Sequence, residues 1–131
     1  MENSKVLALA GGVGGAKLAL GLRDILDEES LAIVVNTGDD EEFFGLHVSP
    51  DLDTVMYTLG GIANPDTGWG ISGETFRSLN RLRQYGADTW FNLGDLDMAT
   101  HIRRTQLLGQ GNTLSEVTNC LLYTSPSPRD S

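Results

Sequence analysis

The glycine-rich segment Gly11-Gly12-Val13-Gly14-Gly15 is the part of this sequence best suited to chemistry. It follows an apolar run, Val6–Ala10, and precedes a helical pattern that begins near Ala16. Glycine lets the backbone adopt positive φ and come close to a phosphate, and the free N–H groups at a helix start attract negative charge. Because Lys17 adds a mobile positive charge, we expect this segment to form a phosphate cradle.

The spacing of these residues differs from the two common phosphate-binding motifs. Gly12-Val13-Gly14 gives the first half of a dinucleotide fingerprint, but Lys17 stands where the third glycine would be. Ala16-Lys17-Leu18 also replaces the Gly-Lys-Ser/Thr of a P-loop, which would place a hydroxyl on magnesium. The alternative is a tight strand-to-helix turn with no ligand, because glycine turns are common in α/β units.

Acidic side chains lie in two later segments that could bind a cation. Asp39 and Asp40 follow a second apolar run, Leu31–Val35, and Asp51 and Asp53 are separated by one residue. Magnesium takes one or two carboxylates, with waters and substrate phosphates completing its octahedron. The alternatives are a solvated acidic loop and a helix cap formed by Asp51.

Hydrophobic periodicity places the first segments in a β-α-β unit, with a helix over Lys17–Leu26 between two buried strands. The predicted fold class is α/β, a Rossmann-like doubly wound parallel sheet of which this chain supplies the N-terminal part. Ligands bind such sheets at the carboxyl ends of the strands. There Gly11–Gly15 and the segment Asn36–Asp40, with the hydroxyl of Thr37, would face one crevice.

In the second half of the chain, composition and hydrophobic periodicity predict a long functional loop, two helices and a short strand. The loop Gly60–Gly73 contains Trp69, and the other elements are a helix over Glu74–Tyr85, a strand over Thr89–Phe91 and a helix over Asp97–Leu108.

The last of these helices places Asp97, His101 and Arg104 on one face. The simpler interpretation is an ion-paired helix surface, in which His101 and Arg104 neutralise Asp97. His47 has no second histidine at metal-ligand spacing and is predicted to be a loop residue.

Composition excludes several classes of function. The chain has 131 residues, 40% of them hydrophobic, which suits one globular domain. Its net charge of −9 disfavours nucleic acid and anionic membrane as partners, because both require a basic surface. With the single cysteine Cys120, no apparent leader and no apolar run of membrane-spanning length, we expect a cytoplasmic protein without an internal disulfide.

Four segments, in order, resemble the 2-phospho-L-lactate transferases that build the deazaflavin coenzyme F420. They are Gly11-Gly12-Val13-Gly14-Gly15-Ala16-Lys17-Leu18, Val35-Asn36-Thr37-Gly38-Asp39-Asp40, Val48 through Leu59, and Trp90 through Thr105. The resemblance implies a magnesium-dependent transfer of a phosphorylated three-carbon acid from a guanylyl-activated donor to the ribityl hydroxyl of a deazaflavin. Members of this family are often homodimers, which leaves a homodimer open here.

By similarity, Asp40 and Asp53 are the candidate Mg²⁺ ligands. Asp53 also lies where the family approaches the acceptor hydroxyl, so it could orient that nucleophile and is the candidate catalytic residue. Asn92 matches a position near the deazaflavin, and Trp69 is a weaker candidate for contact with its ring. The glycines at positions 11, 12, 14 and 15, with Lys17 and Thr37, would hold the donor.

The resemblance covers residues from about Val6 to Thr118, whereas family members are more than twice as long as this chain. Residues 1–119 are therefore predicted to be the N-terminal part of one transferase domain. Residues 120–131 turn abruptly to Ser and Pro and are predicted to be a non-native tail.

Two other functions are consistent with the same residues. A nucleotide-sugar-binding regulatory protein of similar fold would bind without catalysis. An NAD-dependent oxidoreductase, suggested by the partial fingerprint, would place Asp39 or Asp40 on a ribose and would need no metal.

Overall fold

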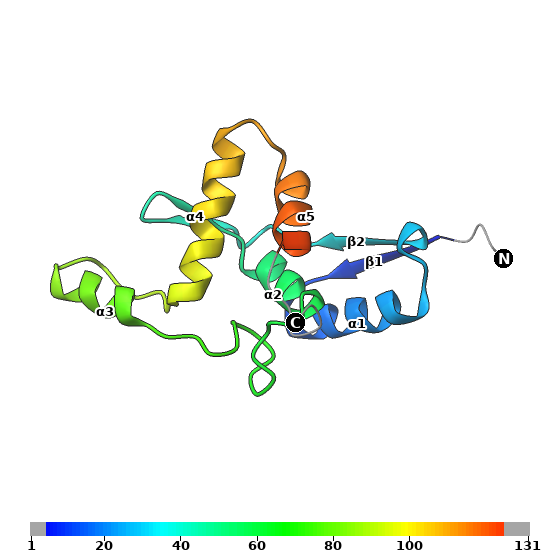
Figure 1. Ribbon diagram of the computed structural model, residues 1–131, viewed down its shortest axis with the longest axis horizontal. Coiled ribbons are helices and arrows are strands. Elements are labelled where there is room, and N and C mark those ends of the chain that lie inside the picture. The colour runs from blue at the N-terminus through cyan, green and yellow to red at the C-terminus, as the bar shows by residue number, and fades with distance from the viewer. Residues whose placement is uncertain (1–4, 125–131) are drawn as a thin grey trace.

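The computed structural model describes residues 5–124 and has an α/β architecture (Figure 1). The elements, in chain order, are β1 (Val6–Ala10), α1 (Gly12–Ile25), a short 3-10 turn (Glu28–Ser30), β2 (Leu31–Val35), β3 (Glu41–Phe43), β4 (Leu46–Val48), α2 (Pro50–Leu59), α3 (Arg77–Gln84), α4 (Asp95–Gly109) and α5 (Leu114–Thr124). The predicted α/β class with a parallel sheet is confirmed, and the arrangement is consistent with a Rossmann-like fragment.

Strands β1 and β2 pair in parallel, with Val6 opposite Leu31 and Ala10 opposite Val35. Helix α1 connects them and lies along one side of the two strands (Figure 1), so the predicted β-α-β unit is present. Small side chains fill the space between the strands, α1 and α2, where Ala16 is fully buried. This small-residue core lets the two helices approach the sheet closely.

The first helix begins earlier than predicted, at Gly12 rather than near Lys17. Gly12 has a φ of 76°, which turns the chain from strand to helix within one residue. Gly15 is required for a different reason, because a Cβ there would lie 2.8 Å from the Cα of Ala10. The glycine segment therefore forms the turn and the first turns of the helix, rather than a loop before it.

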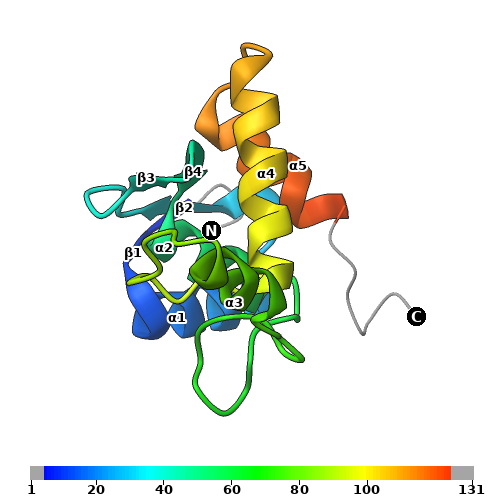
Figure 2. The same cartoon turned by 90° about the vertical axis from the view of Figure 1, so that its left-hand side faces the viewer.

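Strands β3 and β4 form an antiparallel hairpin in which Phe43 lies opposite Leu46. The two turn residues, Phe44 and Gly45, have φ values of 53° and 76°, as a type I′ turn requires. His47 lies in β4, so its predicted loop position is wrong. The hairpin lies beside α4 (Figure 2).

The strand predicted over Thr89–Phe91 is not present, because this segment is irregular in the structure. Its aromatic side chains pack on the hairpin instead. The ring of Phe91 stacks on that of Phe43 with centroids 4.5 Å apart, and Trp90 meets Phe43 edge-on at 5.2 Å. A side-chain cluster, rather than backbone pairing, explains this run of aromatic residues.

Two helix starts also differ from prediction. Helix α3 begins at Arg77 rather than Glu74, and α4 begins at Asp95 rather than Asp97. Two carboxylates explain both starts, as described below: Asp95 accepts from the first N–H groups of α3, and Glu74, just before α3, accepts from the first N–H groups of α4.

The second face of the β1–β2 sheet is open in the described part of the chain. Leu7 and Leu9 are 62% and 73% exposed, whereas Ala8 and Ala10 on the opposite face are buried. The described helices include none that is long and apolar enough to cross a membrane. The predicted boundary after residue 119 falls inside α5 and stays a prediction, and residues 125–131 of the predicted tail lie outside the described residues.

Candidate functional site

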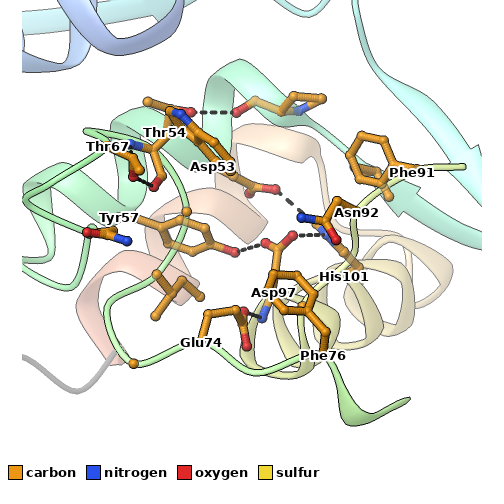
Figure 3. A pocket seen from close by; sticks show the side chains of 18 residues that line it. Asp53, Thr54, Tyr57, Thr67, Glu74, Phe76, Phe91, Asn92, Asp97 and His101 are labelled. Atoms are coloured by element: carbon orange, nitrogen blue, oxygen red, sulfur yellow. Dashed lines mark hydrogen bonds and ion pairs between the residues drawn. The ribbon is translucent and has the colours of Figure 1, made fainter. Parts of the chain in front are cut away.

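A cavity of about 470 Å³ opens between α2, α4 and the loops that precede α3 and α4 (Figure 3). This volume is in the range of small-molecule sites. Its polar side chains come from both helices and from the loops, and its apolar walls include aromatic rings. The residues that line it include Asp53, Thr54, Tyr57, Thr67, Trp69, Ile71, Glu74, Phe76, Phe91, Asn92, Asp97 and His101.

Asp53 lies in the first turn of α2 and is 5% exposed. The guanidinium of Arg104 reaches both of its carboxylate oxygens: Nη2 contacts Oδ1, and Nη1 lies 3.4 Å from Oδ2. Nδ1 of His101 lies 3.6 Å from Oδ2. Burial raises the pKa of Asp53 to about 6, and the charge and hydrogen bonds of Arg104 oppose that rise.

Arg104 and His101 are both fully buried on α4. Nη1 of Arg104 lies 3.2 Å from Nδ1 of His101 and donates to it, and it also donates to the carbonyl oxygen of His47 at 3.2 Å. Arginine can only donate, so the contact with Nη1 is a hydrogen bond in the tautomer whose Nδ1 accepts. In that tautomer Nε2 carries the proton and donates to Asp97 Oδ2 at 3.0 Å. The predicted helix face exists, but it is buried, and Arg104 pairs with Asp53 rather than with Asp97.

Asp97 also accepts a hydrogen bond from the Tyr57 hydroxyl at 2.5 Å. Burial pushes the pKa of Asp97 up, but the hydrogen bonds from His101 and Tyr57 outweigh it, so the net shift is below the ordinary value. Burial and the neighbouring carboxylates raise the pKa of Tyr57, which keeps its hydroxyl protonated as a donor. Hydrogen bonds thus connect Tyr57, Asp97 and His101, and Asp53 lies beside His101 in the same wall of the cavity (Figure 3).

Helix α4 is held in place by two reciprocal caps. Glu74 accepts from the backbone N–H groups of Leu96 at 2.8 Å and Asp97 at 2.9 Å. Asp95 accepts from the hydroxyl of Thr75 at 2.6 Å and from the first backbone N–H groups of α3. These bonds lower the pKa of Asp95 to about 2. The caps fix where α4 begins, and so where Asp97 meets the cavity.

The glycine segment lies at the start of α1, outside the residues that line the cavity. The helix has Gly11 as its N-cap, with no side-chain cap and no acidic residue in its first turn. Its first N–H groups therefore have no competing carboxylate on their own helix, which suits an anion. Asp51 accepts from Asn36 at 2.8 Å and lies 3.9 Å from where a Cβ on Gly11 would be. The side chains of Lys17 and Thr37 are exposed near this end of the sheet.

Asp40 is tied to the start of α2. Its Oδ2 accepts from the Ser49 hydroxyl at 2.8 Å and lies 3.2 Å from Nε2 of His47. Its Oδ1 is buried and has no hydrogen-bond partner among the described residues. An unpaired buried carboxylate oxygen fits a cation ligand. Asp53 fits less simply, because Arg104 already occupies both of its oxygens.

The structure brings together only some of the residues predicted from sequence. Asp53, Asn92 and Trp69 line one cavity, whereas Gly11, Gly12, Gly14, Gly15, Lys17, Thr37 and Asp40 are not among its lining residues. Among the described residues, one group of acidic and histidine side chains is close enough to share a metal ion. It consists of Asp53, Asp97 and His101, whose side-chain oxygen and nitrogen atoms lie within 4.8 Å of one another. The roles of Tyr57, Glu74 and Arg104 were not predicted; the helical spacing of Asp97, His101 and Arg104 was the available signal for Arg104.

Comparison with known proteins identifies the family of this chain. Residues 6–123 match the family model described as 2-phospho-L-lactate transferase CofD. The chain belongs to this family. The predicted resemblance to the 2-phospho-L-lactate transferases is thereby confirmed.

Curated relatives of this CofD-family chain carry the name phosphoenolpyruvate transferase. The protein from Streptomyces griseus subsp. griseus is 52% identical over 118 residues, which are 89% of this chain and 37% of the relative. The Thermobifida fusca protein is 48% identical over an alignment of 126 positions that covers 89% of this chain and 39% of its own length. The Mycobacterium tuberculosis protein is 47% identical over an alignment of 131 positions that covers 89% of this chain and 40% of its own length. The chain thus spans about two fifths of the length of these relatives.

Proposed function

We propose that this chain supplies the donor-phosphate turn and the acceptor cavity of a transferase in coenzyme F420 biosynthesis. The observation that carries the proposal is the first turn of α2. Asp51 in that turn lies beside the glycine turn at Gly11, and Asp53 lies in the wall of the cavity. One helix turn therefore joins an anion-binding helix start to a small-molecule cavity, as a group transfer between two bound molecules requires.

The donor in this proposal is a phosphorylated three-carbon acid joined through a diphosphate to guanosine. Its diphosphate would bind the free N–H groups at the start of α1, with Lys17 and Thr37 beside it. The names of the relatives favour the enolpyruvyl donor over lactyl-2-diphospho-5′-guanosine, since they are phosphoenolpyruvate transferases.

The acceptor is 7,8-didemethyl-8-hydroxy-5-deazariboflavin, bound in the cavity. Asn92 offers an amide to the polar edge of its ring system, and Trp69 and Phe91 offer flat surfaces to the ring faces. The ribityl chain would extend toward α2, where Asp53 accepts a hydrogen bond from the terminal hydroxyl.

The transfer forms a bond between the acceptor's hydroxyl oxygen and the phosphorus that bears the three-carbon acid. The bond from that phosphorus to the bridging oxygen breaks, GMP leaves, and the hydroxyl proton is released. Asp53 orients the hydroxyl, and the ionised carboxylate is the form that can accept its hydrogen bond. Asp40, whose buried Oδ1 has no partner among the described residues, would hold Mg²⁺, which when bound neutralises charge on the departing nucleotide.

The test uses a chimera in which residues 6–123 of this chain replace the matched segment of the Streptomyces griseus relative. The chimera is incubated with the deazaflavin, each guanylyl-activated donor and MgCl₂, and the products are analysed by mass spectrometry. We expect the phosphodiester product and GMP, with the highest yield from the enolpyruvyl donor. EDTA should abolish the formation of both products. A folded chimera that makes no product with the lactyl, enolpyruvyl or glyceryl donor would contradict the proposal. A cytoplasmic location and a homodimer stay predictions.

A further inference from the structure

We propose that Arg104 is a positioning residue that fixes the Asp53 carboxylate in the wall of the acceptor cavity. This inference rests on the proposed function, in which Asp53 orients the acceptor hydroxyl. Arg104 itself is not among the residues that line the cavity, so it would act through Asp53 rather than on a substrate.

Three separate elements meet at the guanidinium of Arg104. It holds Asp53 of α2 through two nitrogens, the carbonyl oxygen of His47 in β4 through Nη1, and the ring of His101 on its own helix. A bidentate contact from two guanidinium nitrogens defines the plane of a carboxylate, whereas a single point charge does not. The carboxylate of Asp53 is thereby held in one rotational orientation relative to α4 and the hairpin.

The cost of burying Arg104 argues against a purely structural role. Its side chain is fully buried, and its Nε has no hydrogen-bond partner among the described residues. Burying a charged pair with an unsatisfied donor contributes little net stability, and well-packed apolar side chains of similar volume often do as well or better. A role in holding Asp53 explains why a guanidinium occupies this site.

The same guanidinium orients the other polar groups of the wall. By donating to Nδ1 of His101 it directs the Nε2 proton toward Asp97, which in turn accepts from Tyr57. Loss of the Arg104 guanidinium would therefore allow the ring of His101 to rotate, as well as the carboxylate of Asp53.

The chain offers a matched control at the next position. Arg103 is exposed and donates to Gln106 on the solvent side of α4. Arg104→Ala, Arg104→Lys and Arg103→Ala are compared in the chimera for kcat and for the KM of the deazaflavin. Both Arg104 variants should lose about 100-fold in kcat, the order expected for a misplaced reacting group, with KM changed less than threefold. Arg103→Ala should keep the parent kcat.

Chemical rescue separates positioning from charge. Added guanidinium should restore kcat in Arg104→Ala at least tenfold, whereas methylammonium of the same charge should not, because it lacks the planar fork. Equal rescue by the two cations, or a parent-like kcat in Arg104→Lys, would overturn the proposal.

A second measurement does not depend on activity. In the 131-residue chain, carbodiimide labelling followed by mass spectrometry should modify Asp53 slowly in the parent and in Arg103→Ala, and at least fivefold faster in Arg104→Lys. If the parent chimera makes no product, the transferase proposal fails, and this labelling decides the positioning inference by itself. Equal labelling of Asp53 in the parent and Arg104→Lys would overturn it.

Discussion

Arg104 and Asp53 lie 51 positions apart in the sequence and form a buried ion pair in which two guanidinium nitrogens contact the two carboxylate oxygens. The pair connects α4 to the first turn of α2 and places an acidic group in the cavity wall. It also lies at the end of a chain of hydrogen bonds that begins at Tyr57. The chemistry of the cavity therefore depends on how these two helices are held together.

Asp53 should make stability depend on pH between about 4 and 6. Burial raises its pKa from 3.8 to about 6 in the folded protein, so the folded state binds this proton more tightly than the unfolded state. The contribution of Asp53 to the free energy of unfolding is fully present below about pH 4 and is lost as the pH rises to about 6. Relative to Asp53→Asn, the wild-type free energy of unfolding should fall by about 2–3 kcal/mol over this range. Urea unfolding of both proteins at pH 4, 5 and 6 measures the difference; a constant or rising difference would show that the pKa is not raised.

Glu74 should stabilise the start of α4 as a helix cap. Glu74→Ala removes the acceptors for two backbone N–H groups and should lower the free energy of unfolding by about 1–2 kcal/mol, the usual cost of losing an N-cap. Glu74→Gln keeps one acceptor oxygen and should lose less. Glu42→Ala, in the exposed part of β3, is the matched control and should be within about 0.5 kcal/mol of wild type. Equal stability of Glu74→Ala and Glu42→Ala in urea unfolding would rule out the cap.

Gly14 and Gly15 are adjacent but should respond differently to alanine. A Cβ at Gly14 meets no atom within 4 Å, so Gly14→Ala should raise the free energy of unfolding by up to about 1 kcal/mol through helix propensity. A Cβ at Gly15 would lie 2.8 Å from the Cα of Ala10, so Gly15→Ala should cost about 1–3 kcal/mol. Thermal and urea unfolding test both. If Gly14→Ala is stable but binds GDP more weakly than wild type, Gly14 leaves space for a phosphate; unchanged GDP affinity would assign the glycine to the turn alone.

Asp40 should set the magnesium requirement. Its buried Oδ1, which no described residue pairs, is the acceptor that a cation would satisfy. Asp40→Asn should raise the MgCl₂ concentration for half-maximal activity of the chimera at least tenfold. Asp39→Asn changes the exposed neighbouring carboxylate and should leave that concentration within twofold. The same magnesium requirement in both variants would remove Asp40 from the metal site.

The local parts of this fold were predictable from sequence, because hydrophobic periodicity reports on burial one element at a time. The β-α-β unit and the positive φ at Gly12 follow from the apolar runs and the glycine segment. The segment at Thr89–Phe91 misled for a physical reason: aromatic residues favour strands, but here the rings of Phe91 and Trp90 pack on Phe43 instead of entering a sheet.

The candidate site was predictable only in part. Asp53 was a candidate from its spacing with Asp51 and from the family resemblance, and Asn92 from the resemblance alone. The spacing of His101 and Arg104 showed that they share a helix face. Spacing cannot show what that face contacts, since the partner carboxylate of Arg104 comes from another helix and the reciprocal caps of α3 and α4 join residues about 20 positions apart. Those tertiary contacts turn a predicted surface of ion pairs into the buried wall of a cavity.

The decisive experiment for the role of Asp53 is the rate of phosphodiester formation by the chimera carrying Asp53→Asn, with the enolpyruvyl donor, the deazaflavin and MgCl₂. Asp66→Asn, a change to an exposed loop carboxylate, is the control. We expect at least a 100-fold lower kcat for Asp53→Asn, with deazaflavin affinity within threefold of the parent, and a parent-like rate for Asp66→Asn. A parent-like rate for Asp53→Asn would contradict the proposed function, because the first turn of α2 would then not be where donor and acceptor meet.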